Sequence, residues 1–263
     1  MPGSSSAGLS GRDRILISAC LALVCALAWA YLFHLDRQMS ASMAYDVMMA
    51  DMGMSMDKPW TMADVMFTFA MWTVMMIGMM AASAGPMLLL FAATRARRPE
   101  PGARSDVLMF GLGYLAVWTG FSAVAALAQW ALHAGAMLSP AMSASSPYLA
   151  SAILIVAGVY QLTPWKGACL THCRSPIEFL MTHWREGAMG AFQMGRHHGM
   201  YCLGCCWALM YVLFVVGVMN LVWVAALTAL VLLEKVGPAG TVVARLAGAG
   251  MLIAGIARIV TAS

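Results

Sequence analysis

Residues 201–236 read YCLGCCWALMYVLFVVGVMNLVWVAALTALVLLEKV, and the first charged residue in this stretch is Glu234. A membrane-spanning helix needs about 20 apolar residues to cross the roughly 30 Å hydrocarbon core of a bilayer. The stretch is about twice that length, so it predicts two spans with a break near Met219 and Asn220. Its second half is short, and one long tilted helix is the alternative.

Apolar runs of this kind recur along the whole chain. Apolar residues make up 62% of the 263 residues and charged residues 10%, against about 45–50% and about 25% in an ordinary soluble domain. The other runs of roughly span length lie at 15–33, 64–91, 107–132, 148–162 and 241–260. The sequence therefore predicts an all-α fold, a polytopic transmembrane helix bundle with about six or seven spans.

The domain organisation follows from these runs. We expect a disordered basic N-terminus at 1–14, a first span at 15–33, a Met-rich outer loop at 34–63 and a membrane helix-bundle domain at 64–263. The run at 15–33 is long for the apolar region of a signal peptide, and no small-residue cleavage site follows it. We therefore interpret it as an uncleaved span.

The basic residues between the runs indicate the orientation of the chain. If the N-terminus is inside, the inner loops 95–104 and 163–200 hold eight of the fifteen Lys and Arg residues, whereas the first outer loop holds only Arg37 and Lys58. Cytoplasmic loops are enriched in Lys and Arg. We therefore expect a multi-pass protein of the bacterial inner membrane, in contact with the lipid bilayer, with a cytoplasmic N-terminus. The dispersed charge indicates no nucleic-acid partner.

Methionine is the most over-represented residue, with 26 in the chain. Seven of the eight methionines in the expected outer loop lie within 39–56: Met39, Met43, Met48, Met49, Met52, Met54 and Met56. In the second span, Met71, Met75 and Met79 recur every four residues and share a helix face. Thioethers are soft ligands that select Cu(I). The alternatives are a methionine lid on the membrane and ordinary helix packing.

Cysteine and histidine concentrate on the expected inner side. The candidate metal ligands there are Cys169, His172, Cys173, His197, His198, Cys202, Cys205 and Cys206. If the second group is helical, His198, Cys202 and Cys205 lie on one face. Thiolate and imidazole ligands suit Cu(I), and Zn²⁺ is the alternative. Small Cys and Gly residues that let helices approach closely are the non-functional explanation.

A short amphipathic helix is expected near 175–184, between the two Cys groups. Ser175, Pro176 and Glu178 form a helix-start pattern. The apolar residues after it fit a helix that lies along the membrane surface. Such a helix would fold the segment around Cys169 back towards the segment around Cys202.

Several motifs resemble a known family. They are Tyr160 to Pro164, Cys169 to Pro176, Gly195 to Trp207, and Gly217 to Trp223 with Glu234 and Lys235. From about Asp64 to its end, the chain resembles the bacterial integral membrane family called domain of unknown function 2182, described as predicted metal-binding membrane proteins. The resemblance implies a helical membrane fold and metal binding.

These observations favour a protein that binds and transfers a soft metal ion, most simply copper. It would bind Cu(I) and transfer or transport it across or within the membrane, with outer and intramembrane methionines and inner Cys and His as ligands. A metal-handling membrane or periplasmic protein fits as a partner, and an oligomer is compatible with the sequence. One alternative is a metal- or thiol-dependent membrane enzyme, although intramembrane carboxylates are scarce. The other is a non-catalytic assembly or partner subunit of a membrane complex.

Overall fold

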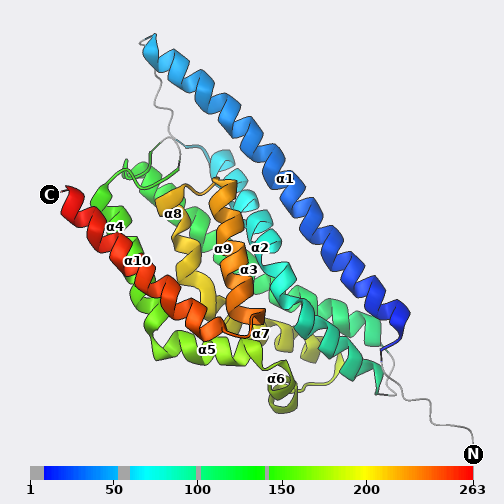
Figure 1. The fold of residues 1–263 in the computed structure, drawn as a ribbon. Helices are drawn as coiled ribbons and strands as arrows, with labels where there is room; N and C mark the ends of the chain where they lie inside the picture. Colours follow the sequence, from blue (N-terminus) through cyan, green and yellow to red (C-terminus); the bar gives the residue numbers. More distant parts are fainter. Residues whose placement is uncertain (1–8, 53–59, 99–101, 140–141, 263) are drawn as a thin grey trace, which may run out of the picture.

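The computed structural model describes residues 9–52, 60–98, 102–139 and 142–262. Over these ranges the protein is helical, and its only β-type pairing is an isolated bridge between Leu138 and Ala144. The helices are α1 (Gly11–Asp51), α2 (Met62–Ala96), α3 (Ala103–Ala134), α4 (Pro147–Leu162), α5 (Pro164–Arg174), α6 (Pro176–His183), α7 (Gly187–Tyr211), α8 (Leu213–Val216), α9 (Leu221–Val236) and α10 (Gly240–Ala262). Figure 1 shows them as one bundle of long helices, which confirms the predicted all-α membrane fold.

Within the described residues, five helices are long and apolar enough to cross a membrane: α1, α2, α3, α7 with α8, and α10. The α4–α5 pair adds a sixth as a span bent by 62°. The bend falls at Thr163 and Pro164, because proline has no N–H with which to continue α4. The seventh expected span corresponds to α9. This helix has only 16 residues, so it is shorter than an ordinary membrane-spanning helix.

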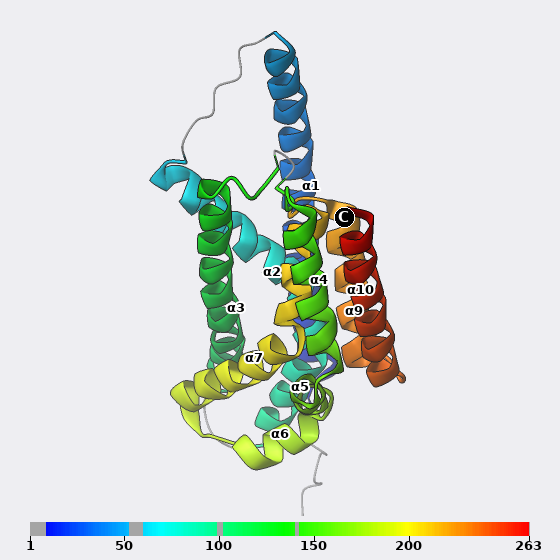
Figure 2. The ribbon, with the colours of Figure 1, turned by 90° about the vertical axis from the view of Figure 1, so that its left-hand side faces the viewer.

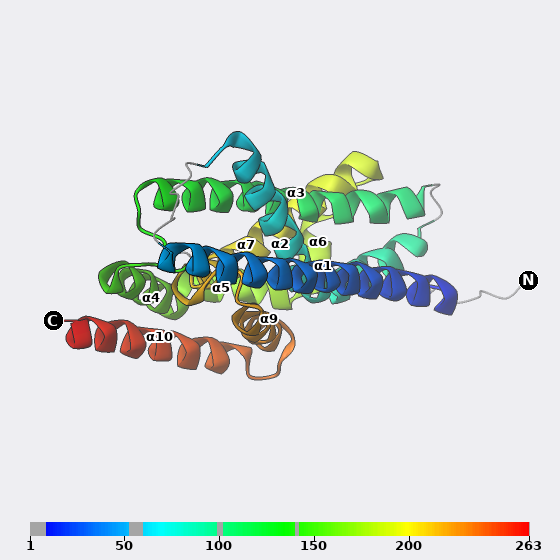
Figure 3. The same cartoon turned by 90° about the horizontal axis from the view of Figure 1, so that it is seen from above.

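The bundle is organised around α2 and α7. Of the most apolar stretch of each helix, 56% of the residues are buried in α2 and 61% in α7, against 11% in α1. In Figure 2, α3 lies on one side and α4, α9 and α10 on the other, with α2 running obliquely between them. The view in Figure 3 shows α10 at one edge of the bundle. Exposed side chains such as Leu27 of α1, Leu108 of α3 and Ile253 of α10 make the outer surface of the bundle apolar.

Two parts of the expected chain division differ in the structure. α1 continues to Asp51, so the first span and most of the Met-rich segment after it form one helix, which projects beyond the bundle in Figure 2. It begins at Gly11, inside the segment expected to be disordered. Residues 1–8 lie outside the described residues, as do Met54 and Met56.

The long apolar stretch 201–236 contains the predicted break. The chain turns at Gly217, which has a φ of 95° that favours glycine, and α9 begins after Asn220. The Asn220 side chain accepts a hydrogen bond from Trp223 N, so it caps α9. The expected surface helix near 175–184 is present as α6, which buries Phe179 and Leu180, but Ser175 makes no side-chain cap to it.

Helices α3 and α7 cross at glycines. A Cβ atom on Gly113 would lie 2.1 Å from the carbonyl oxygen of Phe192, and one on Gly195 would lie 1.9 Å from that of Phe110. Small residues let membrane helices approach this closely, where lipid supplies no hydrophobic force to hold them together. This crossing fixes the position of the cysteines that follow on α7.

Gly113→Ala should therefore destabilise the protein by about 1–3 kcal/mol, because the added methyl group overpacks the α3–α7 crossing. The measurement is thermal unfolding of the purified protein in detergent. Gly111→Ala is the matched control on the same helix, where a Cβ meets nothing within 4 Å. Equal melting temperatures for the two variants would contradict the prediction.

Candidate metal centre

The buried part of α7 carries three cysteines. Cys202, Cys205 and Cys206 are each at most 2% exposed. The thiols of Cys205 and Cys206 each donate a hydrogen bond to the carbonyl oxygen of Cys202, at 3.0 and 2.9 Å. Cys202 and Cys206 are four residues apart, so both lie on one face of the helix. Their sulfur atoms meet side chains from α2 and α9.

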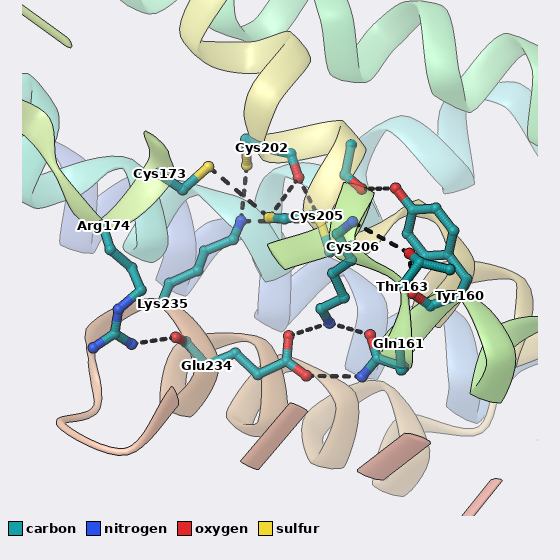
Figure 4. Close-up of polar contacts among 12 residues, drawn as sticks. Tyr160, Gln161, Thr163, Cys173, Arg174, Cys202, Cys205, Cys206, Glu234 and Lys235 are labelled. Carbon is teal, nitrogen blue, oxygen red and sulfur yellow. Dashed lines mark hydrogen bonds and ion pairs between the residues drawn. The ribbon is translucent and has the colours of Figure 1, made fainter. Parts of the chain in front are cut away.

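The sulfur atoms on this face converge on the ammonium group of Lys235. Its Nζ lies 2.8 Å from Cys202 Sγ and 3.9 Å from both Cys206 Sγ and Met80 Sδ. Cys206 Sγ is in turn 4.0 Å from Met80 Sδ. Figure 4 shows Lys235 extended towards the cysteines of α7. We call Met80, Cys202, Cys206 and Lys235 the sulfur–lysine cluster.

Tyr114 of α3 closes one side of this cluster. Its hydroxyl group lies 3.0 Å from Cys202 Sγ and donates a hydrogen bond to the Met80 carbonyl oxygen at 3.3 Å. The ring is buried. Helices α2, α3, α7 and α9 therefore all contribute to one buried polar group inside an apolar bundle.

The thiols of α5 lie next to those of α7. Cys205 Sγ is 3.9 Å from Cys173 Sγ. Cys169 packs against Gly204: a Cβ atom added to Gly204 would lie 2.7 Å from the Cys169 sulfur. Tyr160 donates a hydrogen bond from its hydroxyl group to the Gly204 carbonyl oxygen and so holds α4 against the same turn of α7. The two Cys groups of the sequence are neighbours in space.

Three of the histidines form an aromatic group beside α6. The ring of His172 stacks on Tyr201 with centroids 4.5 Å apart, and His197 stacks on the same tyrosine at 4.9 Å. His183 meets His197 edge to face at 4.4 Å. These ring contacts join α5, α6 and α7.

His198 has a different environment. It is 4% exposed and lies between the rings of Tyr114 and Phe179, at centroid distances of 5.9 and 5.5 Å. Its Nδ1 atom is buried and has no hydrogen-bond partner among the described residues. His198 stands one turn before Cys202 on the same face of α7.

A second buried network lies directly beside the cluster. Glu234 Oε2 is 2.6 Å from Lys166 Nζ, and Glu234 Oε1 accepts a hydrogen bond from Gln161 at 2.8 Å. The Glu234 carbonyl oxygen accepts a third bond from Arg174 at 2.5 Å. In Figure 4 the side chains of Glu234 and Lys235 point in different directions. Although Glu234 and Lys235 are neighbours in the sequence, each has its own partner.

Among the described side chains, no three His, Cys, Asp or Glu residues form a group that could hold a metal ion. The sulfur–lysine cluster contains two thiols, and its third sulfur belongs to a methionine. Its donors are therefore the soft type that suits Cu(I), rather than the nitrogen and oxygen donors of harder metals.

A family model described as PpoB2, copper chaperone, matches residues 69–258. The match covers more than half of the chain. The protein belongs to the PpoB2 copper chaperone family. No curated protein and no solved structure matches it. The match confirms copper as the metal with which the family is associated, and it includes every residue of the sulfur–lysine cluster.

The ligands predicted from the sequence lie in different places in the structure. Met71, Met75 and Met79 are buried in the core of α2, but it is Met80, in the neighbouring row, whose sulfur meets Cys206. The sequence offered a signal for Met80, since Met76 and Met80 also recur at four residues. The sequence signal for Lys235 was weaker: it is a charged residue at the end of a long apolar run.

Lys166→Met should destabilise the protein by about 3–5 kcal/mol, because it leaves the Glu234 carboxylate buried without its ammonium partner. The double variant Lys166→Met/Glu234→Gln removes both charges and should recover most of that loss. The measurement is unfolding of the purified variants in detergent. A double variant no more stable than Lys166→Met would contradict this explanation.

Proposed function

We propose that the protein binds Cu(I) at the sulfur–lysine cluster and passes it on within the bacterial inner membrane. One observation carries the proposal: three buried sulfur atoms, from Cys202, Cys206 and Met80, lie around one positive charge, the ammonium group of Lys235. The copper chaperone description of the family supports copper as the cargo. Zn²⁺ is the less suitable ion, because a thioether is a soft ligand.

The spacing of two of the three sulfur atoms, those of Cys206 and Met80, supports binding at this cluster. A metal–thiolate bond is about 2.3 Å long in zinc sites, so three sulfurs around one trigonal ion lie about 4 Å apart. Cys206 Sγ and Met80 Sδ are 4.0 Å apart. Both residues lie on helices packed in the core, so binding requires side-chain movement rather than rearrangement of the bundle.

Lys235 gives the cluster a compensating charge. A Cu(I) ion held by two thiolates carries a net negative charge, and an uncompensated charge is costly to bury. The ammonium group lies within 4 Å of all three sulfur atoms. In this proposal it withdraws from the sulfurs when copper enters and remains close enough to balance the complex.

Transfer would follow the soft ligands in both directions from the cluster. The buried methionines of α2 lead towards the end of the bundle where α2 begins, and Cys205, Cys173 and Cys169 lead towards α5. Exchange between such ligands moves Cu(I) without a change in its oxidation state. With a cytoplasmic N-terminus, the methionines face the outside and the α5 thiols the cytoplasm, where a metal-handling partner protein would exchange copper with them.

The first test is copper content. The wild-type protein, purified under reducing conditions with Cu(I), should retain copper after desalting. Cys202→Ser/Cys206→Ser should lose the copper bound at the cluster and so retain less than the wild type, because two of the three sulfur ligands are gone. Cys20→Ser/Cys25→Ser is the matched control in α1, where Cys20 is exposed and Cys25 is half-buried. Elemental analysis measures the result. Equal copper in all three proteins, or zinc in place of copper, would refute the proposal.

The second test addresses the thioether. Met80→Leu keeps the volume of the side chain and removes one ligand, so the dissociation constant for Cu(I) should rise roughly tenfold, or by about 1.4 kcal/mol. Competition with a chromophoric Cu(I) chelator measures it. Met66→Leu is the control, since Met66 lies on the same helix and is 57% exposed. The same affinity in both variants would remove Met80 from the site.

A further inference from the structure

A second group of methionines lines a cavity at the end of the bundle where α2 begins. The cavity has a volume of about 380 Å³. Four of its lining residues are methionines from four different segments: Met39 of α1, Met71 of α2, Met142 of the segment before α4 and Met219 of the turn before α9. Segments far apart in the sequence therefore bring their thioethers to one space.

The segment that carries Met142 is held in place. Met142 has a φ of 55°, in the left-handed region that non-glycine residues rarely adopt. Its N–H donates to the Ser139 carbonyl oxygen at 2.9 Å, and its own carbonyl oxygen accepts from Val218 N at 3.4 Å. These bonds fix Met142 beside the turn of Met219.

The cavity is continuous with the buried methionine row of α2. Met71 lines it and is 7% exposed, and Met75, Met76, Met79 and Met80 below it are fully buried. Met71 and Met80 are nine residues apart, which is about 13 Å along a helix. Met80 then meets Cys206 in the sulfur–lysine cluster. Thioethers thus extend from the cavity to the proposed copper site.

The chemistry of the lining suits a soft cation. Thioethers are neutral, so they bind Cu(I) without first losing a proton. Asp64 is the one charged side chain among the described lining residues, and its negative charge attracts cations. Ordinary packing would account for methionines in a core, but it does not call for four of them around a cavity.

We infer that this cavity is a second Cu(I) site, held by thioethers alone, from which copper enters the methionine row of α2. The inference rests on the proposed function, because it takes the sulfur–lysine cluster as the destination. The cavity site would bind more weakly than the cluster, since it lacks thiolates. It would serve as the entry site at the end of the bundle where α2 begins.

The test uses the whole protein in lipid nanodiscs, with Ag(I) as a redox-stable soft probe and Cu(I) in parallel. Met39→Leu/Met142→Leu/Met219→Leu removes three thioethers with little change in volume. The matched control is Met66→Leu/Met181→Leu/Met189→Leu, three exposed methionines that do not line the cavity. Bound metal is counted by elemental analysis, and its sulfur ligands are examined by X-ray absorption.

The wild type and the control triple variant should each bind two equivalents, and the cavity variant one. Cys202→Ser/Cys206→Ser should retain one equivalent with thioether ligands only. A cavity variant that binds as much metal as the wild type would overturn the inference and leave the proposed function intact. A Cys202→Ser/Cys206→Ser variant that binds both equivalents would instead refute the sulfur–lysine site.

Discussion

Two adjacent charged residues, Glu234 and Lys235, are buried inside a bundle that is largely apolar. Buried charges are costly unless each has a partner, and inside a membrane bundle the partner must come from another helix. Glu234 therefore draws in Lys166 and Gln161, and Lys235 draws in the sulfur atoms of α7 and α2. The end of α9 is fixed by these contacts, and they join α4, α5, α7 and α2 at one point.

This constraint explains how a cluster of reactive groups persists where lipid supplies no hydrophobic force between helices. The α3–α7 crossing at Gly113 and Gly195 sets the position of α7 by close contact. The charge network then sets α5 and α9 against it. The cysteines of α7 consequently lie between the α3–α7 glycine crossing and the buried charge network. The methionine row of α2 packs against them from a third direction.

Much of the fold could be predicted from the sequence, because span length and helical period are local properties. The break after Met219, the helix near 175–184 and the buried face of His198, Cys202 and Cys205 all follow from them. The partners of Lys235 do not. Successive residues on a helix point in different directions, so Glu234 and Lys235 cannot pair as neighbours, and their true partners depend on packing. The choice of Met80 over Met79 likewise depends on how α2 is rotated against α7, which the period alone leaves open.

In the proposed function, the order of the ligands along the bundle itself sets a direction. The cavity offers only thioethers, the cluster combines a thioether with two thiols, and the α5 side offers thiols. Thiolates bind Cu(I) through charge as well as softness, so each step from the cavity inwards leads to stronger ligands. Copper would therefore move towards the thiols without an energy source, and its release would need a partner that competes for it. Such a donor gradient is the behaviour of a chaperone that loads another protein, whereas a pump must work against its own ligands.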